Sequence, residues 1–523
     1  MSGIVLSASV RQNLLALQNT ASLLATTQNN LATGNKVNTA LDNPTEFFTA
    51  QSLNNRASDI SNLLDGFSNG VQVLQAANTG LTSLQKLVDS AKSIASQVLQ
   101  APTGYTTKSS ITSAVISGAT ANNLLGSSSN NFVTATNPVN NDNATPVAIT
   151  GSTHLSGTSS STSNDLASNI TTGDTLTVNG VVFTFVAGSV SAGTNIGIGD
   201  TVSNLLGAID AVTGASTTPS TVSGGKISLA TGTAQDLTLS GSALAKLGLI
   251  AGTTARNPPA LSGQTLTIAA TGGGTPTNIT FGTGASQIST LNQLNTVLAA
   301  NNLQASLSTN GALTILTTNE AASSTIGAVS GSSTTSGQAF NGVTASTPVI
   351  DPDSQTTRAG LIAQYNNVMA QINTTAQDAS FNGINLLNGD TLKLVFNETG
   401  RSTLNITGVT FNDAGLGLAN LTVGTDFLDS NSANKVLTSL DTASTALRSE
   451  ASALGSNLSI VEIRQDFNKN LINVLQTGSS NLTLADTNEE AANSQALSTR
   501  QSIAVSALSL ANQSQQSVLQ LLR

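Results

Sequence analysis

Residues of the types that catalyse reactions or bind metals are rare in this chain. It has no cysteine and one histidine, His154, which stands in a stretch rich in serine and threonine. Zinc sites in proteins use about three or four protein ligands, mostly Cys and His, so His154 is interpreted as a solvated side chain rather than a ligand. The HExxH motif of zinc peptidases needs two histidines and is therefore excluded.

Two further short motifs resemble ligand-binding sequences only in part. Gly224-Gly225-Lys226-Ile227 lacks the Ser or Thr after the lysine and the upstream glycine of a phosphate-binding loop, so it is interpreted as a turn before a strand. Asp351 and Asp353 would give a calcium ion two carboxylates, too few to predict a site. The sequence thus predicts no catalytic, cofactor-binding or metal site, and we do not expect an enzyme.

The composition of the chain limits the classes of molecule that it can be expected to bind. The chain has 523 residues, of which 9% are charged and 3% aromatic, and its net charge is -9. Nucleic-acid binding needs clustered Lys and Arg, so no nucleic-acid partner is expected. No apolar run approaches the ~20 residues that span a bilayer, so the chain is not expected to be membrane-inserted. The first residues lack the basic segment and long apolar core of a cleaved signal peptide, so export would use another route.

Both ends of the chain carry apolar residues at coiled-coil spacing. Val10, Leu17, Leu24 and Leu31 are seven residues apart, with Leu14 between them, and Leu497, Ala504, Leu508, Ala511, Val518 and Leu522 alternate three- and four-residue steps. This spacing predicts two α-helices that pair with each other. Ile503 and Leu510 lie off the C-terminal seam, which indicates more than one neighbour. From Gln501 to Leu522 the polar face has no charge, which is unusual for a helix in water.

Two longer helical stretches lie inside these ends. The first begins at Asn43-Pro44-Thr45-Glu46, an N-cap followed by proline and a capping-box glutamate, and keeps a seven-residue apolar step from Leu53 to Ala95. The second keeps the step through Leu440, Leu447, Leu454, Val461 and Leu475, and we expect it to end at Gly478. A third helical segment starts near Thr357, and a β-hairpin is predicted from Leu392–Phe396 with Leu404–Phe411.

The intervening residues, about 105–354, are rich in Ser, Thr, Gly and Asn and contain a diverged repeat. Asp174-Thr-Leu-Thr-Val178 matches Gln264-Thr-Leu-Thr-Ile268. A strand with phenylalanine, a short helix and further strands follow each copy. We predict two small α+β units, at about 173–250 and 263–330, with loops or a loose β region at 105–170.

Three motifs of this chain resemble bacterial flagellin. They are Gly34–Asn38, Ser380-Phe-Asn-Gly-Ile-Asn-Leu-Leu387 and the specific ending Ala511-Asn-Gln-Ser-Gln-Gln-Ser-Val-Leu-Gln-Leu-Leu-Arg523. Asp42–Thr45 and Asn54–Arg56 are similar to the alphaproteobacterial branch. The resemblance covers residues 1 to about 100 and about 355–523.

The resemblance implies an elongated multidomain architecture, mainly α at the paired ends, with an inserted β-rich, α+β outer region. Residues 1–42 with 479–523 would form the inner core, 43–104 with 355–478 a helical rod with the β-hairpin, and 105–354 the variable outer surface. The residues expected to pack between subunits are Val10, Leu14, Leu17, Leu24, Leu31, Ile503, Leu508, Leu510, Val518 and Leu522.

By the same resemblance the protein would be a structural, extracellular subunit of a flagellar filament used for swimming. Its expected partners are identical subunits, the flagellar type III export apparatus and its chaperone, and the filament cap and hook-associated proteins. No cofactor is expected. The alternatives are the hook–filament junction protein, which has similar terminal helices, and a secreted adhesin or glycan-binding protein. The C-terminal ending favours flagellin over the junction protein.

Overall fold

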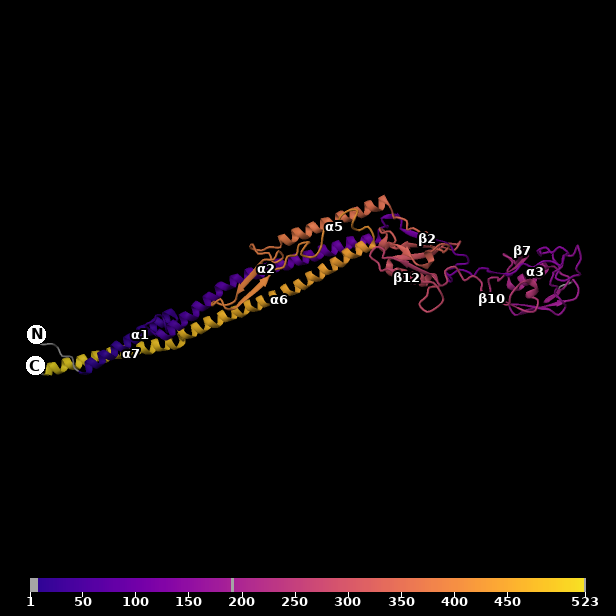
Figure 1. The fold of residues 1–523 in the computed structure, drawn as a ribbon. Helices are drawn as coiled ribbons and strands as arrows, with labels where there is room; N and C mark the ends of the chain where they lie inside the picture. Colours follow the sequence, from indigo (N-terminus) through magenta and orange to yellow (C-terminus); the bar gives the residue numbers. More distant parts are fainter. Residues whose placement is uncertain (1–7, 190–191, 522–523) are drawn as a thin grey trace. The chain divides into compact units, whose positions relative to one another are not determined.

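The computed structural model describes residues 8–189 and 192–521, with side chains up to Ser517 at the C-terminal end (Figure 1). The chain divides into two compact units. The helical unit contains the chain up to Ile94 together with Ala363–Leu421 and the part from Val436 onward, and the β-rich unit contains Ala95–Ile362 and Thr422–Lys435.

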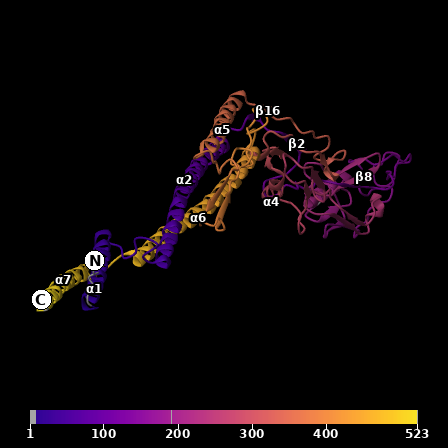
Figure 2. The same cartoon turned by 90° about the vertical axis from the view of Figure 1, so that its left-hand side faces the viewer.

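Five α-helices account for the helical part of the chain: α1 (Ala8–Thr33), α2 (Pro44–Gln100), α5 (Pro352–Asp378), α6 (Ser430–Thr483) and α7 (Thr487–Leu521). Figures 1 and 2 show α2 beside α6 and α1 beside α7. The α2–α6 pair is antiparallel, because Ser479 donates to the Ala50 carbonyl near one end and Lys92 pairs with Asp441 near the other. The predicted pairing of long terminal helices, with a β-rich region inserted between them, is confirmed.

The α2–α6 pair buries the two seams that the seven-residue steps predict. The buried residues recur at the seven-residue step: Ile60, Phe67, Leu74, Leu81 and Val88 on α2 and Leu440, Leu447, Leu454, Val461 and Leu475 on α6. The predicted N-cap of α2 is also confirmed, since Glu46 N donates to Asn43 Oδ1 at 3.2 Å. Burial of this apolar seam stabilises the pair.

The predicted end of the second long helix at Gly478 is wrong. Helix α6 continues to Thr483, because a single glycine inside a helix costs only about 1 kcal/mol and packing against α2 offsets it. The true break lies at 484–486, where Asp486 Oδ1 accepts from Asn488 N at 2.9 Å and starts α7. Main-chain bonds from Lys36 N to Thr483 O (2.7 Å) and from Ala485 N to Gly34 O (3.0 Å) tie this break to the end of α1.

Gly80 in α2 allows neighbouring side chains to approach closely, and a pair of glycine substitutions tests this role. A Cβ on Gly80 would lie 2.6 Å from Ala379 Cβ and 2.7 Å from Leu387 Cδ1, whereas one on Gly66 would meet nothing within 4 Å. We expect Gly80→Ala to lower the free energy of unfolding by about 1–3 kcal/mol through overpacking. The matched change Gly66→Ala is expected to raise it by about 0.5–1 kcal/mol through helix propensity. Urea unfolding followed by circular dichroism measures both, and equal effects would refute the packing role of Gly80.

The predicted β-hairpin is present as β17 (Thr391–Val395) and β18 (Thr403–Thr407), paired antiparallel. The second strand ends four residues earlier than expected, because Val409 N and Phe411 N instead donate to Leu386 O and Leu387 O, both at 2.9 Å. The hairpin is anchored beyond β17 by Phe396. Its ring lies 5.3 Å from the Phe67 ring, and its carbonyl accepts from buried Asn468, the polar residue that interrupts the α6 seam.

The β-rich unit has two separate hydrophobic cores, and we name the surrounding residues module A and module B. Module A (108–126 and 259–346) contains β2 (Ser110–Val115), β11 (Thr265–Ile268), β12 (Thr277–Thr280), α4 (Leu291–Leu298), β13 (Leu303–Leu307), β14 (Ala312–Thr317) and β15 (Val329–Ser330). Module B (129–257) contains β3 (Phe132–Thr134), β4 (Thr175–Val178), β5 (Val181–Val186), β6 (Asn195–Gly197), α3 (Val202–Thr213), β7 (Thr221–Ser223), β8 (Lys226–Ala230), β9 (Leu237–Ser240) and β10 (Gly252–Thr254).

The sheets of each module are small and mostly antiparallel. In module A the strand orders are β12-β11-β15 and β13-β14-β2, and in module B they are β10-β9-β4-β5-β6 and β3-β8-β7. A further pair, β1 (Tyr105–Thr107) with β16 (Val349–Ile350), lies where the chain enters and leaves module A. The predicted strands and short helices are confirmed at these positions, with shifts of a few residues at their ends.

Candidate assembly surfaces

The α1–α7 pair buries few side chains. The buried residues of α1 are Val10, Thr20, Thr27 and Asn30, and among the side chains that the structure describes on α7 none is buried. Asn30 Nδ2 on α1 donates to Glu490 Oε1 on α7 at 2.9 Å. Helices of this length depend on tertiary packing for most of their stability, so this pair leaves much of its apolar surface without cover.

The ten residues predicted to pack between subunits differ in exposure. Val10 is buried within the chain, Leu14, Leu17, Leu24 and Leu508 are partly buried, and Leu31, Ile503 and Leu510 are 40%, 63% and 70% exposed. The side chain of Val518 and the whole of Leu522 lie outside the described residues. Exposed Leu15 and Leu23 on α1 were not predicted, because they lie off the heptad seam. A role of these residues in subunit contacts stays a prediction.

A second apolar stripe on α6 was also missed by the sequence reasoning. Ile460, Phe467 and Val474 are seven residues apart, with Ile463 between them, and all four are 41–65% exposed. They lie next to the seam that faces α2 but on another side of the helix. The signal was present as a second seven-residue step, one position before Val461, Asn468 and Leu475.

The motif Ser380–Leu387 has a structural explanation centred on Asn385. This buried side chain donates from Nδ2 to Ala376 O (2.8 Å) and Gln377 O (2.9 Å), and its Oδ1 accepts from Leu387 N (2.9 Å). It thereby satisfies carbonyl groups at the C-terminal end of α5 that have no partner within the helix. The motif fixes the turn from α5 to the β-hairpin.

A buried arginine joins three segments of the β-rich unit. Arg358, on α5, is 3% exposed and donates to Pro102 O (3.0 and 3.1 Å), Val98 O (3.4 Å) and Phe427 O (2.6 Å). Two of these carbonyls lie at or just after the C-terminal end of α2, where a helix favours a positive charge. Burial lowers the pKa of Arg358, while the nearby Asp429 carboxylate opposes that shift.

The residues singled out for possible chemistry have structural partners. His154 Nδ1 lies 2.8 Å from Gly199 O, and Gly224 and Gly225 have φ of 59° and 76° in the β7–β8 turn, as predicted. Asp351 begins α5, since its carboxylate accepts from Ser354 and its carbonyl from Gln355 N. Within residues 8–189 and 192–521, no three His, Cys, Asp or Glu side chains form a group that could hold a metal ion.

One carboxylate in module B should make stability depend on pH. Burial alone would raise the pKa of Asp174, but hydrogen bonds from Lys246, Thr171 and Ser242 outweigh it and hold the pKa well below its ordinary value of 3.8. Because the folded pKa is the lower one, this group stabilises the fold above about pH 4, and the stabilisation is lost as the pH falls below that value.

Asp174→Asn is expected to weaken this dependence. Its free energy of unfolding should fall less between pH 5 and pH 2.5 than that of the wild type, as measured by urea titration at both pH values. An unchanged pH profile would contradict the assignment.

None of the helices, over the residues that the structure describes, is long and apolar enough to cross a membrane.

Comparison with known families identifies both ends of the chain. The bacterial flagellin N-terminal helical region matches residues 5–123, which include α1 and α2, and the bacterial flagellin C-terminal helical region matches residues 437–522, which include most of α6 and α7. A domain of unknown function (DUF1522) matches residues 200–284. The flagellin matches therefore lie on the helices that pair in the structure.

Similar proteins include several flagellins. Flagellin FljM of Caulobacter vibrioides is 34% identical over 165 residues, which is 31% of this chain and 59% of that protein. A flagellin of Brucella melitensis is 32% identical over 170 residues, 31% of this chain and 60% of that protein. Flagellin A of Rhizobium meliloti is 35% identical over 113 residues, 21% of this chain and 27% of that protein. The matched segment covers about three fifths of the first two relatives. With both matches on paired helices, the two ends of the chain are the N- and C-terminal helical regions of bacterial flagellins, and they are similar to flagellins of alphaproteobacteria.

Proposed function

We propose that this protein is a structural subunit that polymerises into a bacterial flagellar filament for swimming motility. The observation that carries the proposal is the α7 helix, in which none of the described side chains is buried although Ile503, Val505 and Leu510 are apolar. A single subunit leaves these residues more than half exposed, and neighbouring subunits would cover them. The flagellin matches at both ends support the same conclusion, and nothing in the matches favours the hook–filament junction protein.

The subunit contacts in this proposal are heterologous: one surface meets a different surface of the next subunit, so that contacts continue as a helix. Leu31, Ile503 and Leu510 contribute to them, and so does the exposed stripe of α6. The division into a terminal pair (1–42 with 479–523), a helical rod (43–104 with 355–478) and an outer region (105–354) with two repeats belongs to this proposal.

The proposed location is extracellular, in the filament. The subunit leaves the cell through the flagellar export apparatus, with a chaperone, and contacts the filament cap and hook-associated proteins at the filament's ends. It has no catalytic role in this proposal, which agrees with the structural character of the flagellin family.

Hydrogen exchange on monomer and filament tests the proposal. Amides of α1 and of residues 487–517 should exchange at least about tenfold more slowly in the filament, because neighbouring subunits order these helices when they bury them. Amides of α2 between Leu74 and Val88 are the internal control, since their seam is already buried within the subunit. Equal protection of the terminal helices in monomer and filament would refute the proposal.

A further inference from the structure

Modules A and B share a set of elements in the same order, to which module B adds β6 and β10. Each has an entering strand, a β-hairpin, an α-helix, a second hairpin and a strand that returns to the first hairpin: β2, β11–β12, α4, β13–β14 and β15 in module A, and β3, β4–β5, α3, β7–β8 and β9 in module B. The pairings agree as well. The entering strand pairs with the second strand of the second hairpin, and the returning strand pairs with the first strand of the first hairpin.

The agreement extends to individual bonds in the first hairpin. Gly173 N donates to Phe185 O at 2.8 Å and Phe185 N to Asp174 O at 3.0 Å in module B. In module A, Gly263 N donates to Phe281 O at 2.9 Å and Phe281 N to Gln264 O at 2.8 Å. Phe185 and Phe281 are both fully buried, each in its own core.

A second point of agreement is the tripeptide Ser-Gly-Ser at the end of each returning strand. Gly241 and Gly331 have φ of 122° and 118°, and a Cβ on either would lie 2.3 or 2.4 Å from the carbonyl oxygen of Thr175 or Thr265. The following serines, Ser242 and Ser332, accept a bond from Thr175 N (3.0 Å) and Thr265 N (2.8 Å). Only glycine fits such a backbone at so close an approach, so both modules solve the same local problem in the same way.

The helices agree too. Helix α3 begins at Thr201, whose side chain accepts from Asn204 N, and α4 begins at Thr290, whose side chain accepts from Gln293 N.

Module B is enclosed in the sequence of module A. The chain leaves module A after Gly126 and returns before Leu261, and the two linker strands bond to each other through Ser129 N to Asn257 O (3.1 Å) and Asn257 N to Ser129 O (3.0 Å). The separation of the cores follows these limits, because the core of module A contains Leu125 and Leu261 but no residue between them.

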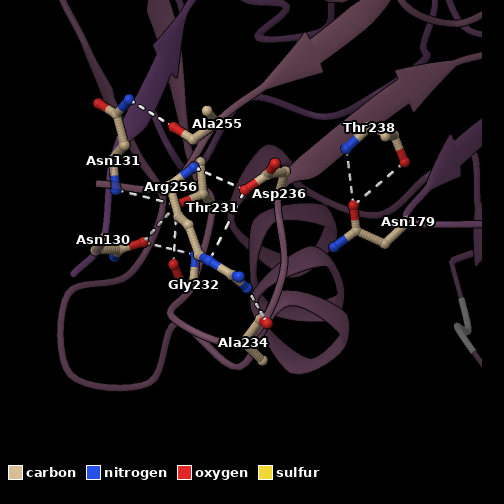
Figure 3. A network of polar contacts seen from close by, with 10 residues as sticks. All are labelled: Asn130, Asn131, Asn179, Thr231, Gly232, Ala234, Asp236, Thr238, Ala255 and Arg256. Atoms are coloured by element: carbon tan, nitrogen blue, oxygen red, sulfur yellow. Dashed lines mark hydrogen bonds and ion pairs between the residues drawn. The ribbon is translucent and has the colours of Figure 1, made fainter. Parts of the chain in front are cut away.

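Side-chain amides hold the linker strands against one end of module B (Figure 3). Asn130 Oδ1 accepts from Gly232 N at 2.6 Å, Asn131 Nδ2 donates to Ala255 O at 2.8 Å, and Arg256 N donates to Asp236 Oδ1 at 3.2 Å. This end carries the connection after β8. In module A, the connection after β14 bonds to the segment before α6, through Ser323 to Asp429 at 2.6 Å. Equivalent ends of the two modules therefore carry their attachments. In module B this end bonds to the linker strands, and in module A it bonds to the segment before α6.

The domain of unknown function does not coincide with either module. Its match begins at Asp200, beside the start of α3 in module B, and ends at Gly284, just after β12 in module A. It thus contains the second part of module B and only the first hairpin of module A, so it crosses the boundary between the two modules.

We propose that residues 129–257 are a second copy of the fold that 108–126 and 259–346 form around them, inserted into a loop of the first copy, and that this inserted copy unfolds without unfolding its host. The host is complete without the insert, because β2 already occupies in module A the place that β3 occupies in module B. Few bonds cross the linker, so destabilisation of one core has little means of reaching the other.

The test uses the full chain with matched substitutions, Phe185→Ala in module B and Phe281→Ala in module A, and hydrogen exchange followed by mass spectrometry. Phe185→Ala should accelerate exchange at least about tenfold in β4, β5, β8 and β9 and leave β11, β12 and β14 within about twofold of the wild type. Phe281→Ala should give the reverse pattern.

Comparable acceleration in both modules from either variant would overturn the proposal, because it would show one cooperative unit. If the phenylalanine variants do not yield folded protein, Ile227→Val and Ile279→Val remove one buried methylene from each core and are read in the same way.

Discussion

Replacing Ile503 and Leu510 together with aspartate is expected to raise the critical concentration for polymerisation at least about 100-fold without disturbing the folded subunit. Both side chains are more than half exposed in the subunit, so the change removes little packing there. In the proposed filament they are covered, and burying unpaired carboxylates costs several kcal/mol. A cost of about 3 kcal/mol per subunit already gives a factor of about 100.

Pelleting and electron microscopy over a concentration series measure this effect. The matched control is Val147→Asp with Ile250→Asp, which places two charges on exposed apolar residues of module B (57% and 66% exposed) and should polymerise as the wild type does. Polymerisation of the α7 variant at the wild-type concentration would contradict the proposed inner contacts.

Arg358→Ala is expected to lower the free energy of unfolding of the β-rich unit by about 3 kcal/mol or more. The arginine donates to three backbone carbonyls, and alanine would remove these bonds, each of which comes from a charged donor and contributes about 1.5–3 kcal/mol. Arg358→Lys should recover only part of the loss, since an ammonium group cannot reproduce the planar fork.

Urea unfolding, with hydrogen exchange to locate the loss, measures the effect. Arg401→Ala, at an exposed position, is the control and should change stability by less than about 0.5 kcal/mol. A loss for Arg358→Ala no larger than that of the control would contradict the role given to this side chain.

The parts of the fold that were predictable depend on short-range patterns. The seams of α2 and α6 follow from a seven-residue step that each helix shows on its own, and the start of α2 follows from Asn43, Pro44 and Glu46. The strands of both modules were predictable for the same reason, since alternation and turn residues lie close together in sequence.

The parts that were missed depend on contacts between distant residues. The role of Arg358 requires Val98 and Phe427, which are far from it in sequence, to come together in space. The prediction that α6 ends at Gly478 treated this segment as an isolated helix, in which glycine weakens the structure. In the folded subunit, packing against α2 keeps the helix continuous through this residue. For the assembly surface, Ile503 and Leu510 were identified because they are apolar residues off the C-terminal seam, whereas the α6 stripe was missed because its seven-residue step runs one position before the stronger step of the seam that faces α2.

The paired linker strands at Ser129 and Asn257 have a consequence for the durability of the outer surface. Because module B is joined to its host by two peptide connections, a protease that cuts one linker strand once does not release it. The module stays covalently attached through the other strand, and loss of this part of the surface requires two separate cleavages.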